Sequence, residues 1–250
     1  MDYIVHYNRN GLCSPECGIL TSKNPLLSRL TMTRIGAGEK GGSMMPRELL
    51  TARGHSSRER ILKLAAQLVY EKGVQGTSLD DICAAASVNK SQLYHYFTNK
   101  EDLVLAIIER QTSMVLAGQQ PFLDHLDSWE NLERWGTFLV ASLEERQCVG
   151  GCPIGSLASE LADHNEASRV ALVSSFDQWE RYLIEGLTAM QERGELRRDA
   201  DPTELAVAVM ASLQGGLLLS QTCKTTRPLQ IALHAAFTYV HSFAFRPDAS

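Results

Sequence analysis

The sequence predicts an all-α protein in which an N-terminal helix-turn-helix unit of three helices precedes a larger helical domain. The stretch 77–100, TSLDDICAAASVNKSQLYHYFTNK, has the caps and apolar spacing of two short helices joined by a tight turn. Apolar residues recur at helical spacing over most of residues 100–243. Glycine and proline stand where periodic stretches end, as at Gly73, Pro121 and Gly194.

Composition and charge are those of a globular protein whose two halves differ. The chain has 250 residues, 44% hydrophobic and 21% charged, with a formal net charge of -5. Residues 1–110 hold 14 Lys and Arg against 11 Asp and Glu, whereas residues 111–250 hold 10 against 18. Contact with nucleic acid is therefore expected in the first half. The chain starts without a basic-then-apolar signal, which predicts a cytoplasmic protein.

Residues 1–53 have no apolar periodicity. Gly, Ser, Asn, Pro and Thr are scattered through them, and Gly36 to Ser43 forms a flexible run. Met44 and Met45 follow that run and are candidates for a second translation start. We predict a disordered N-terminal extension over residues 1–53.

A helix-turn-helix domain is expected over residues 54–100. Ser56 or Ser57 can cap its first helix, which should run to Lys72. Thr77 or Ser78 can cap the second, where Asp80 and Asp81 suit a first turn rich in free backbone N–H groups. Residues 86–89 leave room only for a turn, and Asn89 can cap a third helix over residues 90–97.

The outer face of the helix over residues 90–97 is suited to DNA. Leu93 and Phe97 face inward one turn apart, while the remaining side chains can donate hydrogen bonds and none is acidic. A helix in the major groove needs such donors for phosphates and base edges. The partner expected is double-stranded DNA, and the candidates for base edges are Lys90, Ser91, Gln92 and His95.

A long helix and a second domain complete the chain. Asn99 can cap a connecting helix over residues 101–120, which spans about 30 Å before Pro121. Residues 121–250 then form a helical domain. Its helices are expected over residues 129–147, 155–162, 168–193, 204–221 and 229–243.

These motifs, in this order, resemble the TetR/AcrR family of one-component bacterial regulators. The resemblance covers residues 58–115 and is strongest in the run LYHYF at 93–97 followed by Lys100 and Leu103. Ser87 departs from the family pattern, which has glycine in the turn. A serine is strained there if its φ angle is positive.

The resemblance implies roles for further residues and for the second domain. Family positions matching Tyr94, Tyr96 and Lys100 clamp the DNA backbone. Thr77 and Ser78 stand at a helix start that can also meet phosphate. The C-terminal domain of the family binds a small-molecule effector and forms a homodimer, so the resemblance implies a ligand-responsive repressor of a palindromic operator.

The effector pocket is expected among the aromatic residues of the C-terminal domain. Such pockets are mostly apolar with a few polar anchors, which predicts an apolar or aromatic effector. A single aromatic residue at helical spacing is more often part of the core. Residues 151–160 resemble the branch of the family that includes the lincomycin-resistance repressor. The ligand-binding candidates are Trp135, Phe138, Ser142, Phe176, Trp179 and Gln214.

The last two helices are expected to form the dimer surface, as half of a four-helix bundle. Residues 205–219 are apolar on all sides, which a single intramolecular face does not explain. Polar Ser and Gln within this uncharged stretch favour a helix buried in protein over one in a membrane. The interface residues predicted are Leu205, Ala206, Ala208, Val209, Ala211, Ser212, Leu213, Gly215, Gly216, Leu217, Leu233, Phe237 and Val240.

The alternative class is a redox-sensing or catalytic helical protein using Cys148 or Cys152. The chain has no nucleophile–histidine–aspartate order, phosphate loop or carboxylate pair that supports catalysis. Its six cysteines have no zinc-ligand spacing. We therefore expect no enzymatic activity, no cofactor and no metal.

Overall fold

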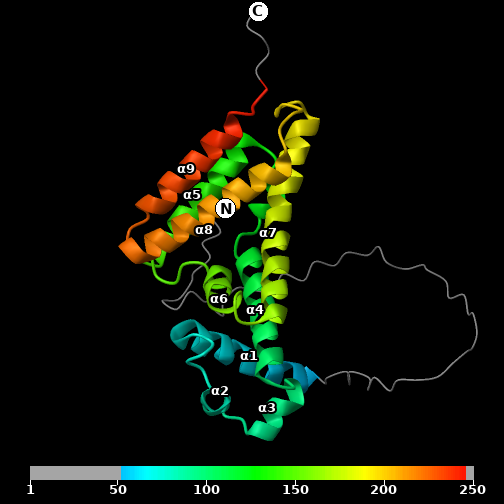
Figure 1. The fold of residues 1–250 in the computed structure, drawn as a ribbon, viewed down its shortest axis with the longest axis vertical. Coiled ribbons are helices and arrows are strands. Elements are labelled where there is room, and N and C mark those ends of the chain that lie inside the picture. The colour runs from blue at the N-terminus through cyan, green and yellow to red at the C-terminus, as the bar shows by residue number, and fades with distance from the viewer. Residues whose placement is uncertain (1–51, 246–250) are drawn as a thin grey trace, which may run out of the picture.

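The computed structural model describes residues 52–245, and within them it contains nine α-helices and one short 3-10 helix. The predicted all-α fold is confirmed. Figure 1 shows a small unit of α1 to α3 at one end of the molecule, and α4 rises from it alongside α7 into the larger helical domain. Residues 1–51 of the predicted extension, with both candidate translation starts, lie outside the described residues.

The small unit consists of three helices and the start of a fourth. Its core contains Ile61, Leu93 and Phe97, each at most 2% exposed. The prediction that α1 begins at Ser56 or Ser57 is wrong, because the helix already includes both serines, whose hydroxyl groups a helix tolerates. The helices are α1 (Ala52–Lys72), α2 (Leu79–Ala86), α3 (Lys90–Tyr96) and α4 (Lys100–Ala117).

The larger domain follows the predicted order of helices, with ends shifted by a few residues. Pro153 and Pro202 stand in the first turns of two of them, where a missing N–H costs nothing. The elements are η1 (Leu123–His125), α5 (Trp129–Glu145), α6 (Pro153–Leu161), α7 (Glu166–Glu192), α8 (Pro202–Cys223) and α9 (Arg227–His241).

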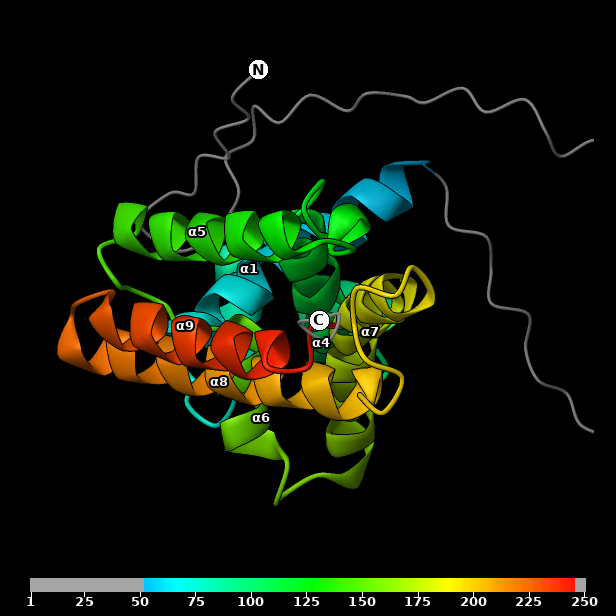
Figure 2. The ribbon, with the colours of Figure 1, turned by 90° about the horizontal axis from the view of Figure 1, so that it is seen from above.

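Helices α8 and α9 form a hairpin, and α8 packs between α7 and α9. Figure 2 shows these two helices side by side, with α5 alongside α9. Trp135 and Trp179 are fully buried in the core of this domain. Helix α8 is the one described helix long and apolar enough to cross a membrane by length and composition, and 44% of that window is buried against the rest of the protein.

The connecting helix α4 is fixed to both parts of the molecule. It packs on α1, where Arg110 of α4 and Glu59 of α1 form an ion pair. Farther along, the hydroxyl groups of Thr112 on α4 and Ser175 on α7 are 2.7 Å apart and both buried. Helix α4 thus contacts both the small unit and the larger domain.

Candidate nucleic-acid interface and ligand cavity

The turn between α2 and α3 is set by local hydrogen bonds. Ser78 caps α2 through a reciprocal capping box, in which the Asp81 amide donates to the Ser78 hydroxyl and the Ser78 amide to the Asp81 carboxylate. The hydrogen bonds from the Ser78 side chain and backbone lower the pKa of Asp81. Asn89 caps α3 by accepting from the Gln92 amide at 2.7 Å. Both local predictions are confirmed, with Ser78 as the cap of α2.

Ser87 adopts the left-handed conformation, with φ 51° and ψ 48°. Its backbone N–H donates to the carbonyls of Ala84 and Cys83, which closes the end of α2. A residue with a Cβ atom is strained in this conformation, and glycine is not. The replacement of the expected glycine by Ser87 therefore costs stability at this turn.

Helix α3 presents a surface of hydrogen-bond donors. Ser91 and His95 are exposed along it, and Gln92 is half-buried. Lys90 is exposed, and its Nζ lies 2.9 Å from Asp80 Oδ1 on α2. Its hydrogen bond to Asp80 raises the pKa of Lys90. The pair also neutralises the carboxylate that stands nearest to this face and would otherwise repel phosphate.

Two tyrosines flank this face at the end of α3. Tyr94 is 49% exposed, a large fraction for an aromatic side chain. Tyr96 is half-buried against the core, and its ring lies edge-on to that of His95, with 5.0 Å between the centroids. Tyr94 is therefore freer to reach a partner than Tyr96 is.

Thr77 and Lys100 support the fold of the small unit. Thr77 is fully buried, and its hydroxyl donates to the Gly73 carbonyl at 2.7 Å. The phosphate contact expected of Thr77 stays a prediction, and its buried hydroxyl favours a structural role for the side chain. Lys100 is half-buried, and its Nζ donates to the Val74 carbonyl at 2.7 Å, which leaves two of its three N–H groups for other partners.

Glu160 joins the larger domain to the turn between α1 and α2. Glu160 lies on α6. Its two carboxylate oxygens accept hydrogen bonds from the backbone amides of Val74 and Gln75, each at 2.9 Å. Lys100 binds the carbonyl of the same Val74. One turn is thus held by α6 on one side and by the start of α4 on the other.

A cavity of about 80 Å³ lies at the convergence of five helices in the larger domain. Helix α4 contributes Gln111, Met114 and Val115, and the start of α6 contributes Cys152 and Pro153. Apolar side chains of α5, α7 and α8 complete most of the wall. These are Phe138, Leu139, Trp179 and Leu217.

Three of the six predicted ligand-binding residues line this cavity, namely Phe138, Ser142 and Trp179. Trp135 is fully buried, and its indole Nε1 donates to Gln119 Oε1 at 2.9 Å. Gln214 and Phe176 do not line the cavity. The Gln214 side chain instead lies against Gly155 of α6.

Sequence reasoning missed the contribution of α4 and of the end of α5. Gln111, Gln119 and Arg146 line the cavity, and no acidic residue does. Gln111 is 6% exposed, yet its carboxamide has no hydrogen bond to any described residue. The signal available in the sequence was a glutamine placed among apolar residues on the connecting helix.

A second cavity, of about 380 Å³, lies at the joint between α1, α4 and α6. Tyr70 and Glu160 line it, and the residues shared with the smaller cavity are Gln111 and Pro153. Burial raises the pKa of Tyr70. The two cavities are therefore adjacent, and the second lies nearer to the contact between α1 and α6.

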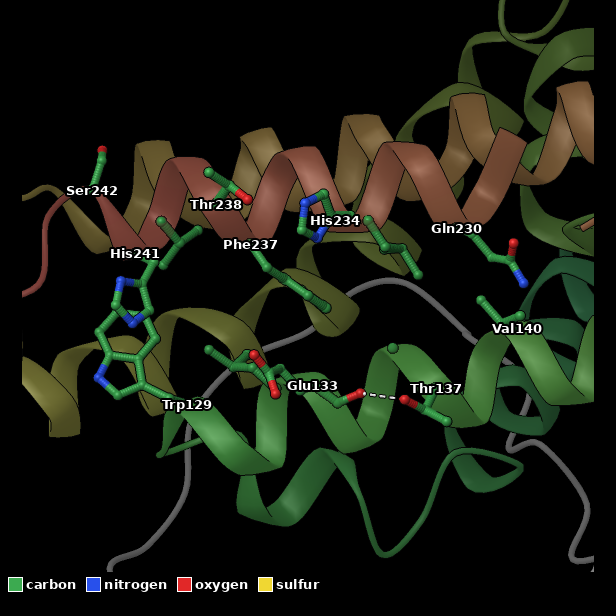
Figure 3. A pocket seen from close by; sticks show the side chains of 14 residues that line it. Trp129, Glu133, Thr137, Val140, Gln230, His234, Phe237, Thr238, His241 and Ser242 are labelled. Carbon is green, nitrogen blue, oxygen red and sulfur yellow. Dashed lines mark hydrogen bonds between the residues drawn. The ribbon is translucent and has the colours of Figure 1, made fainter. Parts of the chain in front are cut away.

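An open groove of about 710 Å³ runs between α5 and α9 (Figure 3). The rings of Trp129 and His241 lie against each other at one end of it, tilted by 43° with 4.5 Å between their centroids. Polar side chains such as Glu133 and His234 border it. Neither α4 nor α6 contributes to this groove, so a molecule bound there touches no helix that reaches the small unit.

The two cysteines of the redox alternative are buried in the structure. Cys148 and Cys152 are free thiols, 4% and 8% exposed. Burial raises the pKa of Cys152, which keeps it in the protonated and poorly nucleophilic form. Among residues 52–245, no group of three or more His, Cys, Asp or Glu is placed to hold a metal ion.

Two family models match the two parts of the chain. Residues 61–107 match the model described as "Bacterial regulatory proteins, tetR family", and residues 130–236 match "Tetracyclin repressor-like, C-terminal domain".

Relatives and solved structures agree with these matches. An HTH-type transcriptional regulator of Lactococcus lactis is 30% identical over 181 residues, which is 70% of this chain and 87% of that protein. The repressor DhaR of a Mycobacterium species is 28% identical, over 72% of this chain and 90% of its own. A TetR regulator of Chloroflexus aurantiacus superposes with a TM-score of 0.67 at 27% identity, over 78% of this chain and 98% of its own.

Proposed function

This chain belongs to the TetR family of bacterial transcriptional regulators, and from that premise we propose that it is a dimeric repressor released from a palindromic operator by a small molecule. The observation that carries the proposal is the position of the 80 Å³ cavity. Helices α4 and α6 line that cavity, and both reach the small unit that contains α3.

The DNA contacts proposed are on α3 and at the starts of α2 and α4. Lys90, Ser91, Gln92 and His95 are assigned to base edges, because they are exposed or half-buried donors on the outer face of α3. Tyr94 and Tyr96 with Ser78 and Lys100 are assigned to phosphates, which position the helix without reading sequence.

The dimer proposed uses α8 and α9, with a face different from the one expected. Leu205, Val209 and Leu213 are buried within their own subunit, so the prediction that they form the interface is wrong. The residues predicted at the interface that are buried in the same way are Ala206, Gly216, Leu217, Leu233 and Val240. The opposite face of both helices is exposed and apolar, and a second copy of the chain would cover it. Its residues are Val207, Ala211, Leu218, Leu219, Ile231 and Tyr239.

We propose that an effector releases DNA through the contact between Glu160 of α6 and the turn between α1 and α2. Two copies of α3 must meet successive major grooves about 34–36 Å apart. A molecule that enters the cavity pushes on Pro153 at the start of α6, and α6 carries Glu160 roughly 10 Å farther along, near its other end. Because Glu160 holds the Val74–Gln75 turn, this movement tilts the small unit and changes the distance between the two copies of α3.

The proposal is tested by fluorescence anisotropy of the purified full chain with duplex DNA from upstream of its own gene. Specific binding that exceeds binding to a scrambled duplex by about a thousandfold supports it. Gln92→Ala should alter base preference, whereas Tyr94→Phe should weaken binding to every sequence alike. Lys63→Ala, which removes an exposed charge from α1, is the matched control. Equal affinity for specific and scrambled DNA would contradict the proposal.

A further inference from the structure

The 80 Å³ cavity contains polar groups that the protein itself does not satisfy. Trp179 is 2% exposed, and its indole Nε1 is a buried donor without a hydrogen-bond partner. Gln111 also lines the cavity and is 6% exposed, and its carboxamide makes no hydrogen bond to a described residue. A buried donor without an acceptor costs about 1–3 kcal/mol, so native proteins rarely keep one without a reason.

The polar groups around the cavity are mostly donors. Trp179 can only donate, Gln111 donates through its amide nitrogen, and Arg146 is cationic. The Arg146 Nε already donates to the Ser142 carbonyl, which fixes the guanidinium at the cavity wall. No carboxylate lines the cavity to accept from a ligand. The complement of such a wall is an oxygen atom that accepts hydrogen bonds.

The size of the cavity limits the ligand. A closed cavity of about 150 Å³ holds one benzene molecule, so about 80 Å³ takes roughly three to four non-hydrogen atoms. A longer ligand would have to pass between Gln111 and Pro153, which also line the larger cavity at the joint.

We propose that the effector is a small molecule with an apolar body and a carbonyl or carboxylate oxygen, which accepts hydrogen bonds from Trp179 Nε1 and the Gln111 carboxamide. This inference rests on the proposed function and narrows the predicted apolar or aromatic effector to a compact oxygen-bearing one. Because Gln111 lies on α4, a ligand bound to it would contact the helix that leads to the small unit directly.

Three probes of the same planar shape separate the effect of hydrogen-bond acceptors on binding from the effect of ligand size. Acetone carries one neutral acceptor, acetate carries an anionic pair, and isobutene carries none. The indole N–H signals of the ¹⁵N-labelled full chain report binding directly, because the chain has three tryptophans, at 129, 135 and 179. Acetone or acetate should shift the Trp179 signal downfield in a saturable way, with Trp129 as the internal reference. Isobutene should bind at least about tenfold more weakly, which is the loss expected for one hydrogen bond to a buried donor.

Two variants check the residues. Trp179→Phe keeps an aromatic ring and removes the N–H group. The smaller ring leaves a cavity in the core, so the thermal midpoint without ligand should fall. The tenfold preference of acetone over isobutene should disappear from the ligand-induced midpoint shift, which is measured against the midpoint of the same variant. Gln111→Leu keeps the size of the side chain and leaves the Trp179 indole signal available. It should weaken acetone binding and leave isobutene binding unchanged.

The outcomes are decisive in both directions. The proposal is overturned if isobutene binds as tightly as acetone and acetate, if neither oxygen-bearing probe shifts the Trp179 signal, or if both variants keep the preference for oxygen. A shift with acetate alone or acetone alone supports the proposal and identifies the effector as anionic or neutral. Because these readouts need no DNA, a chain that fails to bind its operator would refute the proposed function without affecting this result.

Discussion

Replacing Glu160 by glutamine should loosen the small unit from the larger domain. Glu160→Gln keeps the length of the side chain but leaves one acceptor oxygen for two backbone donors, and its new NH₂ group faces a backbone N–H. A hydrogen bond to a charged group is worth about 1.5–3 kcal/mol. Because Glu160 is half-buried and Gln75 is exposed, solvent weakens the interaction, and we take a smaller value of about 1–2 kcal/mol.

This loss has two measurable consequences. The thermal midpoint should fall by about 2–6 °C, as expected for a domain of this size. The amide hydrogens of Val74 and Gln75 should exchange about five- to thirtyfold faster, because the same free energy no longer protects them. Glu71→Gln removes the same charge from the end of α1, where Glu71 accepts only from Gln67 of its own helix, and is the matched control.

Hydrogen exchange followed by mass spectrometry or NMR measures both variants without DNA or effector. Unchanged exchange at Val74 and Gln75 in Glu160→Gln would refute the role given to this carboxylate. So would a midpoint no lower than that of Glu71→Gln. Where the exchange does increase, the effect of an effector on DNA affinity should shrink, since we propose that Glu160 transmits the movement of α6.

Three further predictions concern other parts of the chain. Ser87→Gly should raise the thermal midpoint by about 1–3 °C, because relief of the left-handed strain exceeds the added freedom of the unfolded chain; a lower midpoint would contradict this. Leu218→Glu should shift the protein to monomers in sedimentation experiments, whereas Val170→Glu, at an equally exposed apolar position on α7, should leave the dimer intact. In a variant without the cysteines at 13 and 17, iodoacetamide at neutral pH should label exposed Cys223 quickly and buried Cys152 slowly, and equal rates would revive the redox alternative.

The sequence by itself determined the helices and the helix-turn-helix. Ser78 and Asn89 cap α2 and α3 through partners three residues away, and the strain at Ser87 follows from a turn of only a few residues. Such interactions depend on neighbours in the chain, so they can be read from spacing and residue type. The exposed donors on α3 were predictable for the same reason, because Leu93 and Phe97 fix which side of the helix is buried.

Only the tertiary structure decided how the two parts work together. Thr77 suits both a cap and a phosphate contact in sequence, and only the structure shows that it is buried, with its hydroxyl bonded to the Gly73 carbonyl. Glu160 binds an amide 86 residues away, and Gln111 and Trp179 line one cavity whose wall is contributed by five helices. The physical reason is that such contacts depend on how whole helices pack, which the local periodicity of a sequence does not specify.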